Sequence, residues 1–200
     1  YEGQRQDLIR YMRETENQLQ ILLCELAAYL HNKDMEINVW DRIIAFEGRM
    51  HEFIKAAYDY QDNTFYSHPG YYIDYFEMRL AQLQVLHNLH YEIKKIRKMP
   101  KQALVIADYI MYMADYVVEM NIPDQQIEKL EEISEQMKQE ELPKTREEFE
   151  GRALLYHILM DLEEFLVYKK RFVNGLDEKK LRIYWKQEME QKDSANELQK

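Results

Sequence analysis

Residues 8–30 read LIRYMRETENQLQILLCELAAYL. Their apolar side chains recur at spacings of three, four and seven residues, which places them on one face of an α-helix. The pattern predicts a long amphipathic N-terminal helix over residues 1–34. About 30 helical residues span roughly 45 Å. Such a helix can pack on its own bundle or, through its seven-residue recurrence, pair with a second copy of the chain.

Glycine and proline are scarce in the 200 residues, with 5 and 4 copies, although 46% of the side chains are hydrophobic. The apolar content is sufficient for a core, and turn-forming residues are too few for a β-sandwich or barrel. Prolines at positions 69, 100, 123 and 143 separate one helical pattern from the next. The sequence therefore predicts an all-α antiparallel bundle of about six helices as a single domain over 1–175, followed by a weakly helical polar tail over 176–200. After the first helix, the expected helices are 38–61 with Asn38 as N-cap, 71–98, 101–120, 124–140 and 145–174.

The net charge is −10, and a chain of that sign repels polyanions, so nucleic acid is not an expected partner. Cys24 is the single cysteine and lies in an apolar helical run; it forms no internal disulfide and fits a reducing compartment. The sequence contains neither an apolar run of about 18 residues nor an export signal. Because the chain opens at Tyr1 rather than at a methionine, we expect it to be a piece of a larger protein.

Two pairs of metal-ligating side chains occur at helical spacing. Glu47 and His51 are one turn apart, and His87 and His90 also share a helix face. A carboxylate-bridged metal site in a bundle requires Glu-x-x-His on two helices, and the sequence has no such motif. It also has no zinc-binding spacing, phosphate-binding glycine loop or catalytic serine or cysteine motif. We expect no cofactor and no catalysis; the alternative is a helical-bundle metal-binding protein or metalloenzyme that uses these four residues.

Eight aromatic side chains lie between positions 58 and 76, on both sides of a Pro69-Gly70 turn. Tyrosine combines an apolar ring with a polar hydroxyl, so such clusters suit ligand pockets and interfaces. Tyr66, Tyr71 and Tyr72 are therefore candidates for an interaction surface. The alternative is a loop that its own side chains hold down across the end of the bundle.

An acidic stripe is expected on the helix over 101–120, where Asp108, Asp115 and Glu119 recur at helical spacing. Asp108 and Asp115 are candidates for a cation or amphipathic-ligand site. The alternatives are a solvated helix face and pairing with cations of a neighbouring helix. The stretches 103–118 and 153–167 are apolar around most of their circumference, which predicts that both helices are buried inside the bundle.

A basic run stands out in this acidic chain and comprises Lys94, Lys95, Arg97 and Lys98. Cations favour helix C-termini, which is a sufficient structural reason for the run. The functional alternative is contact with anionic lipid headgroups, to which each cation contributes about 1 kcal/mol.

Residues 141–156 read ELPKTREEFEGRALLY and are followed by DLEEFL at 161–166 and KRF at 170–172. Pro143 ends one helix, and Thr145 with Glu148 forms a capping box for the next. Phe149 is expected to begin the buried stripe of that helix. The block resembles the C-terminal domain of the aromatic acid exporters of Gram-positive bacteria, a family related to fusaric acid resistance proteins.

This resemblance implies a membrane exporter in which a hydrophobic N-terminal half, with several spans, precedes the present chain. Tyr1 then lies just after the last span, and the helix over 1–34 continues from it. The implied location is the cell membrane, with this domain on the cytoplasmic side. The implied role is accessory, regulatory or in homo-oligomerisation, and the family assigns no catalytic or ligand residue. A free-standing interaction module is the alternative.

Overall fold

The computed structural model describes residues 2–34, 38–64, 70–186, 194–195 and 197–199. These residues form seven helices and no strand. The helices are α1 (Glu2–His31), α2 (Val39–Asp62), α3 (Gly70–Lys95), α4 (Ala103–Ala114), α5 (Asp124–Lys138), α6 (Arg146–Asn174) and α7 (Glu178–Tyr184). The all-α prediction is confirmed. No helix of the described part combines the length and the apolar character that crossing a membrane requires.

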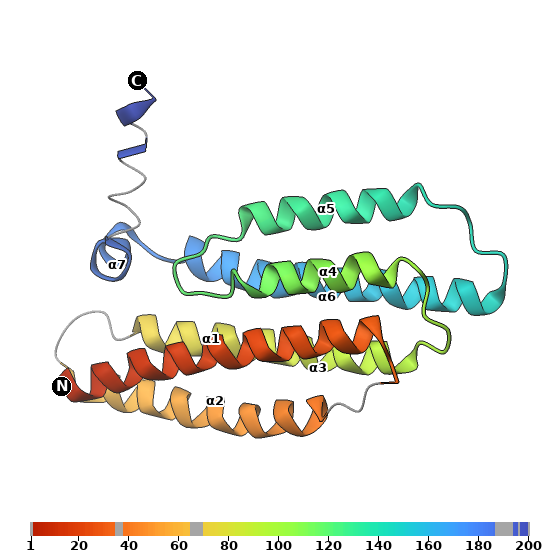
Figure 1. The fold of residues 1–200 in the computed structure, drawn as a ribbon. Coiled ribbons are helices and arrows are strands. Elements are labelled where there is room, and N and C mark those ends of the chain that lie inside the picture. The colour runs from red at the N-terminus through yellow and green to blue at the C-terminus, as the bar shows by residue number, and fades with distance from the viewer. Residues whose placement is uncertain (1, 35–37, 65–69, 187–193, 196, 200) are drawn as a thin grey trace.

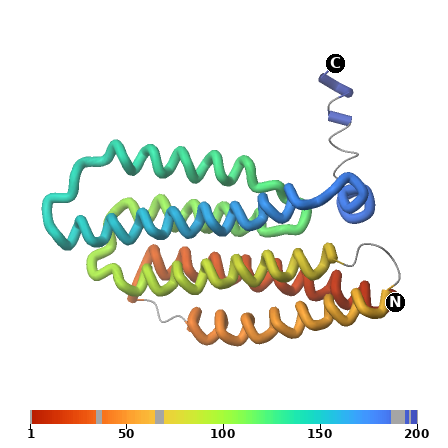
Figure 2. Tube along the Cα trace, turned by 180° about the vertical axis from the view of Figure 1, so that it is seen from behind, coloured from red at the N-terminus to blue at the C-terminus, as the bar shows by residue number. Residues whose placement is uncertain are grey.

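The first six helices lie alongside one another, and each runs antiparallel to the one before it (Figure 1). One half consists of α1, α2 and α3, and the other of α4, α5 and α6. The halves are joined where α3 packs on α6 and α1 packs on α4. The view from behind shows the same arrangement, with α7 at the end of the bundle that holds the N-terminus (Figure 2). The fold is therefore the predicted antiparallel bundle.

α1 packs against its own bundle. Its apolar stripe faces the core, and each member is at most 1% exposed: Leu8, Met12, Leu19, Leu22, Leu26 and Leu30. Burying one such side chain contributes about 1.5–3 kcal/mol. The stripe contacts α2, α3 and α4, so it is occupied within the chain and is not free to pair with a second copy.

α4 is shorter than the sequence predicts and ends at Ala114 instead of near residue 120. Tyr116 N donates to Met113 O and Val117 N to Ala114 O, so the chain leaves the helix in tight turns. These turns place Glu119 inside the protein, where it is 7% exposed. The Glu119 carboxylate finds hydrogen-bond donors on α1 and α3, which stabilise the turned conformation.

α4 and α6 are not enclosed on all sides, which corrects the prediction that both are deeply buried. Leu104, Val105 and Met111 of α4 are 46%, 47% and 48% exposed, and Met160 of α6 is 64% exposed. α4 packs mainly on α1, which leaves another of its faces in solvent. Phe149 is 62% exposed and therefore does not begin the buried stripe of α6.

The capping box that the sequence predicts starts α6. Thr145 Oγ1 accepts a hydrogen bond from Glu148 N at 3.1 Å, and Glu148 Oε2 accepts one from Lys144 N at 2.8 Å. The carboxylate thus returns to the amide one residue before the cap. Asn38 precedes α2 as predicted, but its side chain makes no capping hydrogen bond.

Gly151 lets the connection between α3 and α4 approach α6 closely. A Cβ at this position would lie 3.1 Å from both the carbonyl oxygen of Lys98 and Cγ of Pro100. These distances are tighter than ordinary van der Waals contact, so a side chain here requires the connection to move. The glycine fixes the geometry at the end of the bundle remote from the N-terminus.

The beginning of the tail is ordered by α7. Asp177 caps this helix, since its Oδ1 accepts a hydrogen bond from Lys180 N at 2.7 Å. Trp185 follows α7 and is only 2% exposed. The stretch 176–185 therefore contributes an aromatic side chain to the core, which its weak helical pattern does not predict.

Candidate functional site

Charged side chains from four parts of the chain are buried in one region. Arg79, Lys169, Glu16 and Glu119 are 1%, 4%, 5% and 7% exposed. Burying an ion costs several kcal/mol unless partners compensate it, so such a group is rare in a helical core. We call this group and its partners the buried polar network; it comprises Arg13, Glu16, Tyr71, Tyr75, Arg79, Gln82, Glu119, Lys169 and Trp185.

Arg13 joins α1 to the segment that follows α4. Its Nη1 donates to both carboxylate oxygens of Glu16 at 3.0 Å, and its Nη2 donates to Glu119 Oε1 at 3.0 Å. The guanidinium is 53% exposed, whereas the two carboxylates are 7% and 9% exposed. Solvent therefore screens the Arg13 side of both ion pairs. The planar guanidinium, which donates to both carboxylates, fixes the distance between α1 and the segment after α4.

Three side chains of the network come from successive turns of α3. Tyr71 Oη donates to Glu119 Oε2 at 2.9 Å, and Tyr75 Oη donates to Glu16 Oε1 at 3.1 Å. Arg79 Nε donates to Tyr75 Oη at 3.0 Å. Burial, together with the nearby Glu119 charge, raises the pKa of Tyr71 well above the ordinary tyrosine value, so its hydroxyl remains a donor.

Arg79 also connects α3 to α6. Its Nη1 donates to Gln82 Oε1 at 2.9 Å, and Gln82 Nε2 donates to the carbonyl oxygen of Phe165 at 2.8 Å. The Nη2 of Arg79 lies 3.9 Å from Glu16 Oε1 and has no hydrogen-bond partner in the described residues. The Arg79 guanidinium is thus held by hydrogen bonds from Nε and Nη1 and by the charge of Glu16, while Nη2 donates no hydrogen bond to the described residues.

Lys169 of α6 reaches the segment after α4, where its Nζ donates to the carbonyl oxygen of Val118 at 2.7 Å. Burial lowers the pKa of Lys169 well below the ordinary lysine value, and the Arg79 charge acts in the same direction. Glu16 and Glu119 oppose this shift. The hydrogen bond from Lys169 stabilises the backbone turn at Val118, whereas burial destabilises the charged form of the lysine.

Aromatic rings cover the network at the end of the bundle that carries α7. The rings of Tyr71 and Tyr184 stack with centroids 3.9 Å apart, and Trp185 Nε1 donates to Tyr71 Oη at 3.0 Å. Arg5 Nε donates to Tyr72 Oη at 3.2 Å. Tyr71 and Tyr72 are buried, so they belong to the core and not to an open surface. Tyr66, the third predicted interaction residue, lies outside the described residues.

Two acidic side chains, Glu92 of α3 and Asp161 of α6, lie next to each other. Burial and a hydrogen bond with Glu92 raise the pKa of Asp161 to about 8, and the Glu164 charge adds to the effect while His157 opposes it. Asp161 Oδ2 and Glu92 Oε2 are both buried and lack a donor when both groups are ionised. A proton shared between the two carboxyl groups supplies that donor.

The four predicted metal ligands do not come together as a site. Glu47 is partly buried and His51 is exposed, whereas the His87 ring packs on Trp40 with centroids 4.5 Å apart. The His90 ring lies beside another aromatic ring, that of Tyr29, at 5.7 Å. Among the described residues, no group of three or more His, Cys, Asp or Glu side chains is placed to hold a metal ion.

The predicted acidic stripe is divided by the end of α4. Asp108 and Asp115 are exposed, as a solvated face requires, whereas Glu119 turns into the buried polar network. The basic run is exposed as well. Lys94 and Lys95 end α3, and Arg97 and Lys98 lie in the connection to α4.

The sequence contains a weak signal for the buried polar network, namely charged residues at apolar register positions. Glu16 stands between Met12 and Leu19 on the core face of α1, and Lys169 stands between Phe165 and Phe172 on α6. This register predicts burial for such residues. It does not identify their partners, because Arg13 and Glu119 are 106 residues apart.

Comparison with known proteins connects this fold to a transport family. The description of the family that matches residues 5–170 is "Putative aromatic acid exporter C-terminal domain". The uncharacterized protein YqjA of Bacillus subtilis (strain 168) is 26% identical over 167 residues, which cover 82% of this chain and 51% of YqjA. The chain thus spans about half the length of this relative.

A solved structure shares the fold. The crystal structure of a putative membrane protein from Clostridium difficile 630 superposes with a TM-score of 0.73 at 23% identity, and the match covers 82% of this chain and 98% of that one. At this identity the likeness concerns the fold alone. On the family match over residues 5–170, the chain belongs to the aromatic acid exporter C-terminal domain family.

Proposed function

We propose that this chain is a cytosolic accessory domain of a membrane exporter and that α1 joins it to a membrane-embedded half. The family supports an exporter, and the half-length overlap with YqjA supports a further part in the whole protein. Arg5 and Arg10 near the start of α1 fit the cationic bias of cytoplasmic flanks. In this proposal the whole protein exports aromatic acids, and the domain itself performs no catalytic step.

The buried polar network is the observation that supports an accessory role. α1 contributes Arg13 and Glu16, and their partners lie on α3 and on the segment after α4. Breaking the Arg13–Glu119 pair leaves the buried Glu119 carboxylate without its cation, at a cost of about 1–2 kcal/mol because the Arg13 side chain is 53% exposed. A displacement of α1 is therefore transmitted to the other helices instead of being absorbed by sliding. Through α1 the domain biases the state of the attached pore.

Efflux by the full-length protein tests this role. Glu119→Gln removes the charge that holds Arg13 and Tyr71, whereas Asp108→Asn removes an exposed charge from α4. We expect Glu119→Gln to lower the efflux rate of a radiolabelled aromatic acid at equal membrane abundance, and Asp108→Asn to leave it unchanged. Wild-type efflux by Glu119→Gln would contradict the coupling role.

Thiol labelling tests the cytosolic side. Cys24 is the single cysteine of this chain, and it is replaced by serine in the background protein together with any cysteine of the membrane-embedded half. Tyr91→Cys then introduces a thiol at a side chain that is 55% exposed. A membrane-impermeant maleimide is expected to label it only after the cells are permeabilised. Equal labelling of intact cells would place the domain outside.

Self-association is a second proposed role, and α4 supports it. Leu104 and Met111 lie two turns apart on one face of this helix and are 46% and 48% exposed. Apolar side chains gathered on a surface mark protein contacts. We expect the full-length protein in detergent to sediment as an oligomer that Leu104→Lys with Met111→Lys dissociates. A wild-type monomer at all concentrations would exclude this role.

Lipid binding by the basic run stays a proposal with a geometric condition. Lys33, just after α1, donates to the carbonyl oxygens of Lys94 and Ile96, so the run lies at the end of α1 opposite Glu2. The 30 residues of α1 span roughly 45 Å. If Glu2 faces the membrane, the run reaches lipid only when the bundle lies flat. Salt-sensitive binding to phosphatidylserine vesicles is expected, and its absence would rule lipid contact out.

A further inference from the structure

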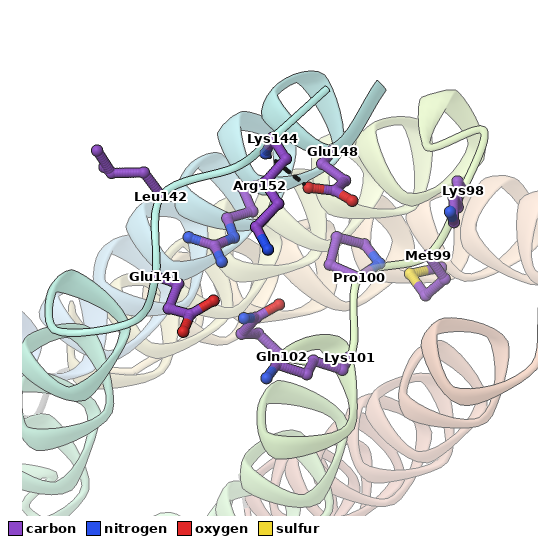
Figure 3. A pocket seen from close by; sticks show the side chains of 10 residues that line it. All are labelled: Lys98, Met99, Pro100, Lys101, Gln102, Glu141, Leu142, Lys144, Glu148 and Arg152. Atoms are coloured by element: carbon purple, nitrogen blue, oxygen red, sulfur yellow. Dashed lines mark hydrogen bonds between the residues drawn. The ribbon is translucent and has the colours of Figure 1, made fainter. Parts of the chain in front are cut away.

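The end of the bundle remote from Glu2 contains a pocket with a cavity volume of about 300 Å³ (Figure 3). Three segments form it: the connection between α3 and α4, the loop between α5 and α6, and the first turns of α6. The close approach of Pro100 to Gly151 holds the first and third segments together. The volume is at the lower end of the range for small-molecule sites.

The pocket is cationic in an acidic protein. Its charged lining residues are Lys98, Lys101, Lys144, Arg152, Glu141 and Glu148, a net charge of +2 in a chain of net charge −10. Figure 3 shows the side chains of Lys144 and Arg152 directed into the space between the two loops. Neither forms an ion pair within 4.0 Å among the described residues, whereas Lys101 lies 3.9 Å from Glu140. Two cations are therefore available to a ligand.

Gln102 supplies an independent sign of a missing partner. This residue lines the pocket and is only 6% exposed. Its Nε2 is buried and donates to no acceptor in the described part of the chain. Figure 3 shows its amide directed toward the same space, beside Glu141. Buried amide donors in native proteins are nearly always paired, and an acceptor atom on a ligand would complete this one.

The amide groups at the start of α6 are not the binding element. Glu148 already accepts from Lys144 N and caps the helix together with Thr145. That hydrogen bond lowers the pKa of Glu148, and the Lys98 and Arg152 charges add to the shift, so this carboxylate is ionised. A ligand oxyanion must therefore bind to side chains. It would meet Lys144 and Arg152 in a pocket that Glu141 and Glu148 also line.

We propose that this pocket binds a small organic anion that carries a phosphate or a carboxylate group. Arg152 and Lys144 hold the oxyanion, and Gln102 donates to an acceptor on the ligand. Met99, Pro100 and Leu142 form an apolar wall for the body of the ligand. The site is independent of the attachment of α1 and lies at the opposite end of the bundle. It gives the domain a means of sensing a solute.

Isothermal titration of the 200-residue chain with inorganic phosphate, phenyl phosphate and benzoate tests the site. The first probe reports the oxyanion alone, and the other two share a ring but differ in the oxyanion. We expect saturable binding of at least one ringed probe. Arg152→Gln should weaken this binding at least tenfold, as should Lys144→Gln. Lys55→Gln, an exposed cation on α2, is the matched control and should leave the affinity unchanged.

Gln102→Leu provides a second test, in which the Tm and the ligand affinity should change in opposite directions. Leucine retains the volume and removes the unpaired donor, so the ligand-free variant should have a higher Tm than wild type while its affinity for the ringed probe falls. No saturable binding of any probe would overturn the proposal, as would equal weakening by Lys55→Gln, which would indicate general charge attraction. Loss of affinity in Lys144→Gln with an unchanged Tm would exclude misfolding as the cause.

Discussion

Trp185 Nε1 donates a hydrogen bond to Tyr71 Oη at 3.0 Å, across 114 residues of sequence. Tyr71 in turn donates to Glu119, which Arg13 also contacts. The residue after α7 is thereby linked, through α3, to the segment after α4 and to α1. The end of the bundle that holds the N-terminus is thus closed by polar contacts as well as by ring packing.

The Trp185 contact is expected to stabilise the whole bundle. Trp185→Phe keeps an aromatic ring but removes the N–H donor, and we expect the free energy of unfolding to fall by about 1–2 kcal/mol. Urea unfolding followed by circular dichroism measures the change. Trp40→Phe, at a site that is 45% exposed, is the matched control and should change stability by less than about 0.5 kcal/mol. Equal effects of the two variants would show that the tail does not dock.

The Arg13–Glu119 pair should show measurable coupling. In a double-mutant cycle of Arg13→Gln and Glu119→Gln, we expect a coupling energy of about 1–2 kcal/mol, because only one partner is buried and solvent screens the other. The exposed pair Arg49–Glu14, whose side chains are 42% and 37% exposed, should give less than about 1 kcal/mol. If the two cycles give the same coupling energy, burial of Glu119 does not strengthen its interaction with Arg13.

Asp161 should make stability depend on pH. Its pKa is raised in the folded state to about 8 from the ordinary aspartate value of 3.8, so the folded protein retains a proton that the unfolded chain loses between these values. The contribution is favourable at low pH and is lost as pH rises from about 4 to about 8. Asp161→Asn should flatten this part of the profile and raise stability at pH 8 by about 1 kcal/mol, because solvent screens this partly exposed carboxylate.

Chemical unfolding at a series of pH values measures the Asp161 effect. Asp108→Asn is the control, because Asp108 is exposed and its substitution should not change the slope. A profile of Asp161→Asn that parallels wild type over pH 4–8 would contradict the shared proton with Glu92.

Gly151 and Gly48 form a matched pair of helical glycines with opposite expectations. Gly48→Ala has no atom within 4 Å of the new Cβ and should stabilise α2 by up to about 1 kcal/mol. Gly151→Ala places a Cβ 3.1 Å from the Lys98 carbonyl oxygen and Pro100, so it should destabilise the protein by about 1–3 kcal/mol. Thermal unfolding compares them, and stabilisation by both would show that the connection shifts without cost.

Local sequence determines the helices because their signals are local. The spacing of Leu8, Met12 and Leu19 defines the core face of α1, and Thr145 with Glu148 defines the start of α6. The prolines separate the helices, and the block over 141–156 identifies the family. Each of these signals acts within one or two helical turns, where backbone hydrogen bonding and side-chain periodicity are sufficient.

The tertiary structure decided where α4 ends and which charges are buried. The spacing of the acidic residues predicts a continued helix over 115–120, yet the chain turns there and Glu119 meets Arg13 and Tyr71. The burial of Trp185 has the same origin, since its partner Tyr71 lies on α3. The sequence by itself therefore determined the helices and their apolar faces. The polar network required the fold, because a buried charge is stable only beside partners that distant segments bring to it.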